Sequence, residues 1–407
     1  MNKKLIALAI ASAFVAPVAM ADSGNVTIYG EFAASVDSVD GGGYGATSAA
    51  VPPVGGILAN VSSSERRARV SSNNSFLGFK GSEDLGNGLS AIWQYEQSIA
   101  IDQQNINDSS AFGAIGGGNQ SRRTTFVGLA DKQWGTVQLG IIDTPFKTST
   151  GPLDPFGQHT LADYRSIMGM IGGTNLASIR AQNAVQYISP NMSGFTVKAL
   201  YSASNEMGND TGNAAGVVTS VTNPHFYSIS GAYADGPLYA ALAYEENKGV
   251  PNTAAVSDFT LKNWRAGVGY KFGDLKIGLG YERIKGDGNT TGATAVHDLS
   301  RGAWYLPVSY QMGSNTLKLA YTKAGSSNQK NVAGADLSGS DGAKQWSLGV
   351  DHAMSKRTSV YALYTQVRND TNGSYALGGG ATGISVVSPA SYGANPSGFS
   401  VGMIHAF

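Results

Sequence analysis

The sequence predicts an all-β fold, namely a sixteen-stranded antiparallel transmembrane β-barrel. Three observations predict it: apolar and polar side chains alternate along many short segments, short polar turns alternate with long polar links, and the chain ends on an alternating segment at Phe407. A period of two residues is the pattern of a strand whose two faces lie in unlike surroundings. The pattern recurs along the whole chain, as a membrane barrel requires.

The first 21 residues have the features of a secretory signal peptide. A basic start is followed by the apolar run Leu5–Val18 and by Ala19–Ala21, which has the small-residue pattern of a cleavage site. The apolar run is too short for a membrane-spanning helix. We therefore expect cleavage after Ala21, which leaves residues 22–407 as a single barrel domain.

The composition excludes several classes of protein. The chain has 407 residues, of which only 14% are charged, and it contains 54 Gly, 19 Tyr and no Cys. Without Cys there is neither a disulfide scaffold nor thiolate chemistry. The 28 basic and 28 acidic residues leave no basic surface for nucleic acid. We expect no cofactor and no nucleic-acid partner, and an exported barrel fits this composition better than several soluble domains.

Residues 75–99 form the clearest predicted hairpin. Leu77 and Phe79 point to one face, while Gly78 and Lys80 point to the other, and the polar link 82–88 has the residues of a tight turn. The returning strand alternates in the same way. Further alternating segments are 26–37, 195–202, 264–272, 275–282 and 317–322.

Links of two lengths divide the chain into sixteen strands. Short links lie near 82–88, 130–135, 190–194, 235–237, 273–274, 313–315 and 354–357. Long links lie near 38–64, 102–121, 143–180, 204–223, 247–258, 286–300, 324–342 and 369–396. Short turns at one rim and long loops at the other are typical of bacterial outer-membrane barrels. A barrel of sixteen strands is wide enough for an aqueous channel.

Aromatic residues gather near the predicted strand ends. They are Tyr201, Tyr244, Tyr270, Phe272, Tyr281, Trp304, Tyr310, Tyr321 and Tyr364. We interpret them as the interfacial girdles of a membrane barrel, and the alternative is the ordinary preference of Tyr for strands. The terminal segment Phe399–Phe407 alternates to its last residue, so we expect Phe407 to serve as an assembly signal.

Several motifs resemble those of one family, the Gram-negative general (non-specific) porins. The matching segments are Asn25–Gly30, Leu77–Gly86, Arg123–Leu129, Asn183–Tyr187 with the following Ser189-Pro-Asn, Ser355–Thr358 and the terminal Phe407. They look most like the trimeric porins of beta-proteobacteria and Neisseria. The resemblance implies a homotrimer in the outer membrane, surrounded by lipid and lipopolysaccharide. It also implies a third loop folded inward as a constriction, and passive diffusion of ions and small hydrophilic solutes.

The third long link, 143–180, is the predicted functional site. It is too apolar for simple disorder, because nine large side chains need cover: Phe146, Leu153, Phe156, Leu161, Tyr164, Ile167, Met168, Met170 and Ile171. The loop is either a lid over the barrel mouth or a segment folded into the lumen, and the resemblance favours the second. It would then bring Asp143, Asp154 and Asp163, together with Arg165, to face cations of the barrel wall.

Arginines line the opposing wall in the family, and Arg123 and Arg180 match such positions. Lys80 also lies on the polar face. Two departures from the family are Phe76 and Ile141, which stand where Arg is frequent, so a strong anion preference does not carry over. We predict a charged constriction formed by Lys80, Arg123, Asp143, Asp154, Asp163, Arg165 and Arg180. The alternative is that these charges only form structural ion pairs.

Other functions have weaker support. An outer-membrane enzyme needs a convergent catalytic set, but the five His residues lie far apart in the sequence, so we expect no enzyme and no metal site. A substrate-selective porin, for a sugar or an organic anion, would need a ladder of aromatics on the lumen face. Tyr29, Phe76 and Tyr239 have the right parity but form no obvious track. An adhesive barrel would use the links 38–64 and 369–396.

Overall fold

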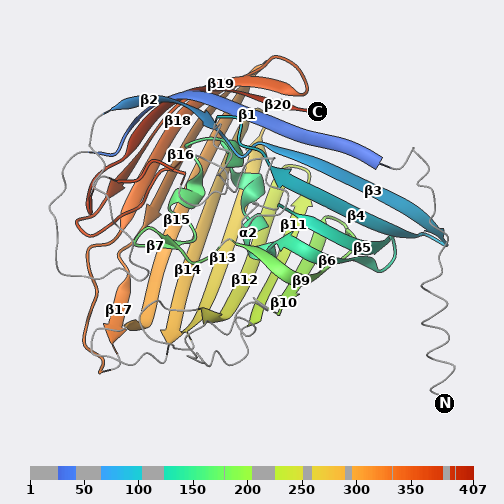
Figure 1. Ribbon diagram of the computed structural model, residues 1–407, viewed down its shortest axis with the longest axis horizontal. Coiled ribbons are helices and arrows are strands. Elements are labelled where there is room, and N and C mark those ends of the chain that lie inside the picture. The colour runs from blue at the N-terminus through green and yellow to red at the C-terminus, as the bar shows by residue number, and fades with distance from the viewer. Residues whose placement is uncertain are drawn as a thin grey trace, which may run out of the picture.

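The computed structural model describes residues 26–42, 66–102, 123–177, 179–203, 225–250, 259–288, 296–331, 333–378, 386–389 and 391–407. The predicted signal peptide and the central parts of most long links lie outside these residues. In the described ranges the chain forms one large antiparallel sheet that curves around a folded loop (Figure 1).

The first half of the barrel consists of the long strand β1 and of mostly shorter strands. They are β1 (Val26–Asp40), β2 (Arg67–Ser72), β3 (Phe76–Gly86), β4 (Leu89–Ser98), β5 (Thr125–Asp131), β6 (Gly135–Asp143), β9 (Arg180–Ile188) and β10 (Phe195–Ser202). The second half is mostly longer. It comprises β11 (His225–Asp235), β12 (Leu238–Val250), β13 (Phe259–Phe272), β14 (Leu275–Gly288), β15 (Val296–Met312), β16 (Asn315–Ala324), β17 (Asn328–Asn331), β18 (Ala343–Ala353), β19 (Thr358–Asn369) and β20 (Ser397–Ala406).

The sheet closes on itself to form the predicted sixteen-stranded barrel. Among the described residues it contains 18 strand segments. The segments β2 and β3 both pair with β1, and β16 and β17 both pair with β15, so each of these pairs is one broken strand. The last strand β20 pairs with β1 over Glu31–Asp40, which completes the circuit. Every pairing in the sheet is antiparallel.

The strand boundaries agree with most of the predicted links, although the link predicted at 324–342 contains the short strand β17. The two-residue turn between β3 and β4 places Asn87 at φ 53° and Gly88 at φ 87°, which are left-handed conformations that Asn and Gly tolerate best. The strands on either side of the third long link end at Asp143 and begin at Arg180. These bounds are those expected from the sequence.

The two faces of each strand lie in different surroundings. On β1, Val36 is 61% exposed on the outer face while its neighbour Ser35 is 3% exposed on the inner face. Outer-face aromatics contact one another in the pairs Tyr201–Tyr227, Tyr244–Trp264, Tyr281–Trp304 and Trp346–Tyr364. We call these eight residues, together with Tyr321, the upper aromatic row.

A second group of aromatics lies at the short-turn end, where Tyr270, Phe272 and Tyr310 are exposed. Trp264 and Phe272 are eight residues apart on β13, which is about 26 Å of strand. Since strands tilt in a barrel, this separation suits an apolar band roughly 25 Å tall. The expected girdles are therefore present on the outer face.

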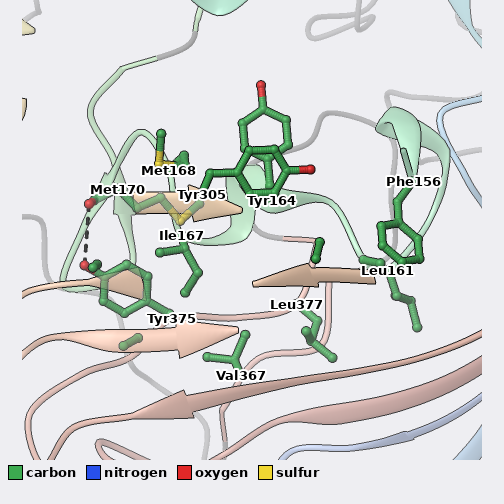
Figure 2. Close-up of a cluster of buried hydrophobic side chains, with 14 of the residues drawn as sticks. Phe156, Leu161, Tyr164, Ile167, Met168, Met170, Tyr305, Val367, Tyr375 and Leu377 are labelled. Atoms are coloured by element: carbon green, nitrogen blue, oxygen red, sulfur yellow. Dashed lines mark hydrogen bonds between the residues drawn. The ribbon is translucent and has the colours of Figure 1, made fainter. Parts of the chain in front are cut away.

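The buried core lies inside the barrel, where the third loop packs. The loop contains α2 (Pro145–Thr148), the 3₁₀ turns η1 (Gly151–Leu153), η2 (Gly157–His159) and η3 (Tyr164–Ser166), and a small hairpin of β7 (Met170–Ile171) and β8 (Thr174–Asn175). Figure 2 shows its apolar side chains against Tyr305, Val367, Tyr375 and Leu377. In the described part of the chain, no helix has the length and apolar character needed to cross a membrane.

Candidate functional site

The third loop lies in the lumen and not over the barrel mouth as a lid. Leu153 packs against a track of lumen-facing glycines on β13 and β14. A Cβ added to Gly269 would lie 2.6 Å from a Leu153 methyl carbon, and one added to Gly267 would lie 2.8 Å from another. The glycines thus make room for the loop, and their neighbour Val268 is exposed on the outer face.

Local signals in the sequence begin the loop. Thr144 accepts a hydrogen bond from the backbone N–H of Lys147 at 3.2 Å, and Pro145 occupies the first helical position of α2. Both features stabilise a helix start. The chain therefore turns sharply into the barrel directly after β6.

Polar groups of the wall fix the backbone of the loop. The Tyr239 hydroxyl donates to the carbonyl of Ser149 at 2.6 Å, and Lys276 Nζ donates to the carbonyl of Pro152 at 2.5 Å. Figure 1 shows the loop surrounded by the barrel strands. Tyr239 points into the lumen, as a member of an aromatic ladder for sugars would, but its hydroxyl is already bonded to the loop.

A buried ionic triad, Arg265–Glu282–Arg301, holds the second half of the loop. Glu282 accepts from Arg265 Nε at 3.0 Å and from Arg301 Nη1 at 3.1 Å, and all three side chains are 0–1% exposed. The triad also bonds the loop: Gly169 N–H donates to Glu282 at 2.8 Å, and Arg301 Nη2 donates to the Ile167 carbonyl at 2.7 Å. The sequence analysis missed the triad, although polar-face parity could have indicated it, because Arg265 lies directly opposite Glu282.

Asp163 and Arg165 bind each other and are withdrawn from water. Arg165 Nη2 lies 2.5 Å from Asp163 Oδ2, and the residues are 2% and 0% exposed. The expectation that Asp163 faces a cation of the wall is therefore corrected. Its partner comes from its own loop, because η3 brings residues two apart together.

Asp154 faces the wall, but its partner there is a hydroxyl group. Its Oδ1 accepts from the Tyr305 hydroxyl at 2.9 Å and from the Phe156 N–H at 3.0 Å. Its Oδ2 is buried without a hydrogen-bond partner among the described residues. Burial and, to a lesser degree, the charge of Asp163 raise the pKa of Asp154 to about 6. The expectation that Asp154 faces a cation of the wall is therefore corrected, because its partner on the wall is Tyr305.

Asp143 and Arg180 are in direct contact, which corrects the expectation that Arg180 lies on the opposing wall of the pore. They are opposite residues of β6 and β9, and Arg180 Nε lies 2.9 Å from Asp143 Oδ1. Lys147 Nζ binds the same oxygen at 2.7 Å. Lys147 was not predicted, although its spacing of four residues from Asp143 is a recognisable signal. Burial lowers the pKa of Lys147 to about 8 despite the favourable charge of Asp143.

Lys80 and Arg123 lie on the opposite wall from Asp154. Arg123, just before β5, bonds Asn74, lies 3.6 Å from Glu96 Oε2 and stacks 4.5 Å from the Phe76 ring centre. Lys80 on β3 is exposed, 4.8 Å from the Tyr29 ring centre. In the closed circuit β3–β5 are half a turn away from β13–β15. Whether these charges line the narrowest section stays a prediction.

One further contact joins the loop to the wall. His159 Nδ1 on η2 lies 2.6 Å from Glu31 Oε1 on β1. Away from the lumen, Asp287, His297 and Asp298 are the potential metal ligands that converge among the described residues, with ligand atoms within 4.8 Å of one another. Their carboxylates are exposed, and exposed acidic groups are common without an ion.

Comparisons with known proteins agree with this architecture. The family model described as Gram-negative porin matches residues 7–372. An outer membrane porin protein of Bordetella pertussis is 28% identical over 73% of this chain and 77% of its own length. The major outer membrane protein P.IA of Neisseria meningitidis is 26% identical over 90% of this chain and 97% of its own length.

Solved structures show the same fold. The anion-selective porin from Comamonas acidovorans superposes with a TM-score of 0.68 at 23% identity, covering 94% of this chain and 99% of its own. The trimer form of OmpT from Vibrio cholerae gives a TM-score of 0.62 at 16% identity, covering 95% of this chain and 100% of its own. A closed barrel with an inward loop and a family match over most of its length together identify the chain: it belongs to the Gram-negative porins, the channel proteins of the outer membrane.

Proposed function

We propose that this porin is a general diffusion pore for ions and small hydrophilic solutes, and that loop 143–180 sets its size limit. The observation that carries the proposal is the position of the loop, which fills one side of the lumen through Leu153 and the glycine track. A segment fixed inside a sixteen-stranded barrel narrows the aqueous path while the barrel width keeps it open.

The lumen charges support an excess of positive charge on the wall opposite the loop. The cations Lys80 and Arg123 lie half a circuit from the loop anchors on β13–β15. The ion pair of Asp143 with Arg180 and the burial of Asp163 and Arg165 reduce the free acidic charge. We propose that the exposed Lys80, with Arg123, dominates ion preference in this pore.

A substrate-selective channel is the second candidate, and one comparison favours considering it. The Comamonas structure is described as an anion-selective porin, and the lumen cations here would suit a similar preference. Against a sugar-selective pore, the lumen-face aromatics are engaged: Tyr239 bonds the loop, and the Tyr29 hydroxyl bonds Glu96 at 2.8 Å. The general pore therefore remains our proposal.

We further propose that the chain assembles as a homotrimer, as in the trimer form of OmpT. Removal of residues 1–21 as a signal peptide and contact with outer-membrane lipid and lipopolysaccharide belong to the same proposal. No catalytic role is proposed.

Conductance across a planar lipid bilayer tests the pore and the loop together. Folded protein is expected to give stepwise conductance, and deletion of residues 151–160 is expected to raise it and to admit larger sugars in liposome swelling. Val268→Ala, on the outer face next to Gly269, is the control and should change neither. An unchanged sugar limit in the deletion variant would contradict the loop proposal, and absent conductance in folded protein would contradict the pore.

A further inference from the structure

Three cations form an unbroken row on the outer face of β16, β18 and β19. Lys323 lies directly opposite Lys344, and Lys344 lies directly opposite Arg368. All three residues are exposed. Directly opposed residues have their Cβ atoms about 5 Å apart, so the row concentrates three positive charges within two strand spacings, about 10 Å.

The row of three cations lies just beyond the upper aromatic row, on the side of the long links. Lys323 follows Tyr321 by two residues, and Lys344 precedes Trp346 by two. Tyr321 and Trp346 are themselves directly opposed. Because aromatic girdles mark the membrane interface and long loops mark the outside of the cell, the row lies at the depth of the outer-leaflet headgroups.

The described part of the chain does not neutralise this cationic row. Within the described residues neither Lys323 nor Lys344 has a hydrogen bond or an ion pair, and Arg368 donates only to Gln366, at 3.2 Å. Asp370, which directly follows the end of β19 and is exposed, makes no ion pair within that part of the structure. Like charges directly opposite one another destabilise a sheet, so a bound external anion would offset the repulsion.

A second pair of opposed cations shows how the chain can compensate such charges. Lys262 and Lys285 are also directly opposed, on β13 and β14. There, however, Glu246 lies opposite Lys262 on β12, and Asp287 and Asp298 lie opposite each other nearby. The row on β16, β18 and β19 has no such acidic partners at its opposed positions.

We propose, building on the lipopolysaccharide contact that belongs to the proposed function, that Lys323, Lys344 and Arg368 bind the phosphate groups of this phosphorylated glycolipid of the outer leaflet. Three cations in line match a headgroup that carries two phosphates on a sugar backbone better than a lipid with one phosphate. The Arg guanidinium binds a phosphate through two N–H groups, and Lys acts as a point charge. Trp346 and Tyr321 are placed to cover the boundary between sugar and acyl chains.

Native mass spectrometry of the folded protein in detergent tests the site. The probes are diphosphoryl lipid A, monophosphoryl lipid A and phosphatidylglycerol. The native protein is expected to retain diphosphoryl lipid A best, and Lys323→Gln/Lys344→Gln/Arg368→Gln is expected to bind it at least about tenfold more weakly, because three charge-assisted contacts are lost. The control, Lys132→Gln/Lys356→Gln/Arg357→Gln, removes the same charges from exposed positions in short turns and should bind like the native protein.

The proposal would be overturned if the native protein and the triple variant bound diphosphoryl lipid A equally. It would also be overturned if the native protein held phosphatidylglycerol as tightly as diphosphoryl lipid A. If the triple variant does not fold, Lys323→Arg/Lys344→Arg/Arg368→Lys keeps the charge and must keep the binding. Binding by the native protein must also weaken between 0.1 and 1 M salt, since the Debye length falls from about 10 Å to about 3 Å. Salt-independent binding would equally exclude the site.

Discussion

Arg123 is held by three neighbouring side chains. It bonds Asn74, pairs with Glu96 and stacks on Phe76, which stands where the family often has a further arginine. Phe76 therefore supplies a ring that orients the remaining guanidinium. The position of Arg123 just ahead of β5 explains why strand parity did not place it, since Val127 and Leu129 of the same parity are exposed on the outer face.

Arg123→Gln should shift the reversal potential under a salt gradient toward cations. The substitution removes a lumen cation and leaves Glu96 without a cationic partner, so both changes favour cations. The shift should shrink in 1 M salt, where the Debye length is about 3 Å. Lys132→Gln, in a short turn, is the control. An unchanged ion preference with altered thermal stability would show that Arg123 only braces the wall.

Asp154 should make loop attachment depend on pH. Burial raises its pKa to about 6, above the value of about 3.9 in an unfolded chain. The folded state therefore binds the proton more tightly, and this stabilisation is complete below about pH 4 and lost as pH rises through about 6. The effect amounts to roughly 3 kcal/mol.

Asp154→Asn isolates this effect because it removes the titrating group. The variant should gain stability relative to the native protein as pH rises from 4 to 7, measured as the midpoint of heat-induced loss of the folded gel mobility. The nearby Asp163–Arg165 pair is present in both proteins, so it does not contribute to the difference between them. A difference between native protein and variant that does not change with pH would refute the assignment.

At the scale of elements, the third loop is held by groups from several strands at once. Glycines of β13 and β14 accept Leu153, Tyr305 of β15 bonds Asp154, and the ionic triad bonds Ile167 and Gly169. A loop with this many buried contacts behaves as part of the core. Its position, and with it the pore limit, is expected to be stable in the absence of solute.

Glu282→Gln should loosen the second half of the loop. Arg265 and Arg301 would then remain buried without a counter-charge, which costs roughly 3–5 kcal/mol. We expect a lower unfolding midpoint, faster proteolysis between residues 160 and 175, and noisier single-channel current. Glu246→Gln, at a residue of β12 that accepts from the Tyr244 hydroxyl and has no hydrogen bond or ion pair with the described residues of the loop, is the matched control. Native-like loop protection in Glu282→Gln would contradict the anchoring role of the triad.

At the scale of the whole molecule, Phe407 completes the barrel. Its N–H donates to the Gly30 carbonyl at 3.1 Å and its carbonyl accepts from the Gly30 N–H at 3.2 Å. Its ring stacks on Phe32 with centres 5.5 Å apart. The last residue thus belongs to the seam where β20 meets β1, so the assembly signal predicted from sequence also has a structural part.

Deletion of Phe407 should reduce insertion into the outer membrane, because both the seam bonds and the ring are lost. Phe407→Ala keeps the backbone bonds and separates the two contributions. Phe399→Ala, an exposed aromatic of the same strand, is the control. Insertion is measured as heat-modifiable protein in outer-membrane fractions, and normal amounts in the deletion variant would disprove the role.

Sequence periodicity was sufficient to predict most of the barrel. Alternation is a local property, so it placed strands, turns and faces, and the ends of the third loop at Asp143 and Arg180. The signal was clear because lipid outside and water inside demand opposite side chains at successive residues. Turn residues such as Asn87 and Gly88 added local conformational signals.

The partners of the charged side chains were decided only when distant strands came together. Arg265 and Arg301 bond loop carbonyls 119 and 134 residues away, and Asp154 meets Tyr305 across 151 residues. Residue type showed that these groups were charged or polar, but a carboxylate binds whichever donor the fold brings nearest. Strand order therefore determined which charges are buried as anchors and which, like Lys80, still face water.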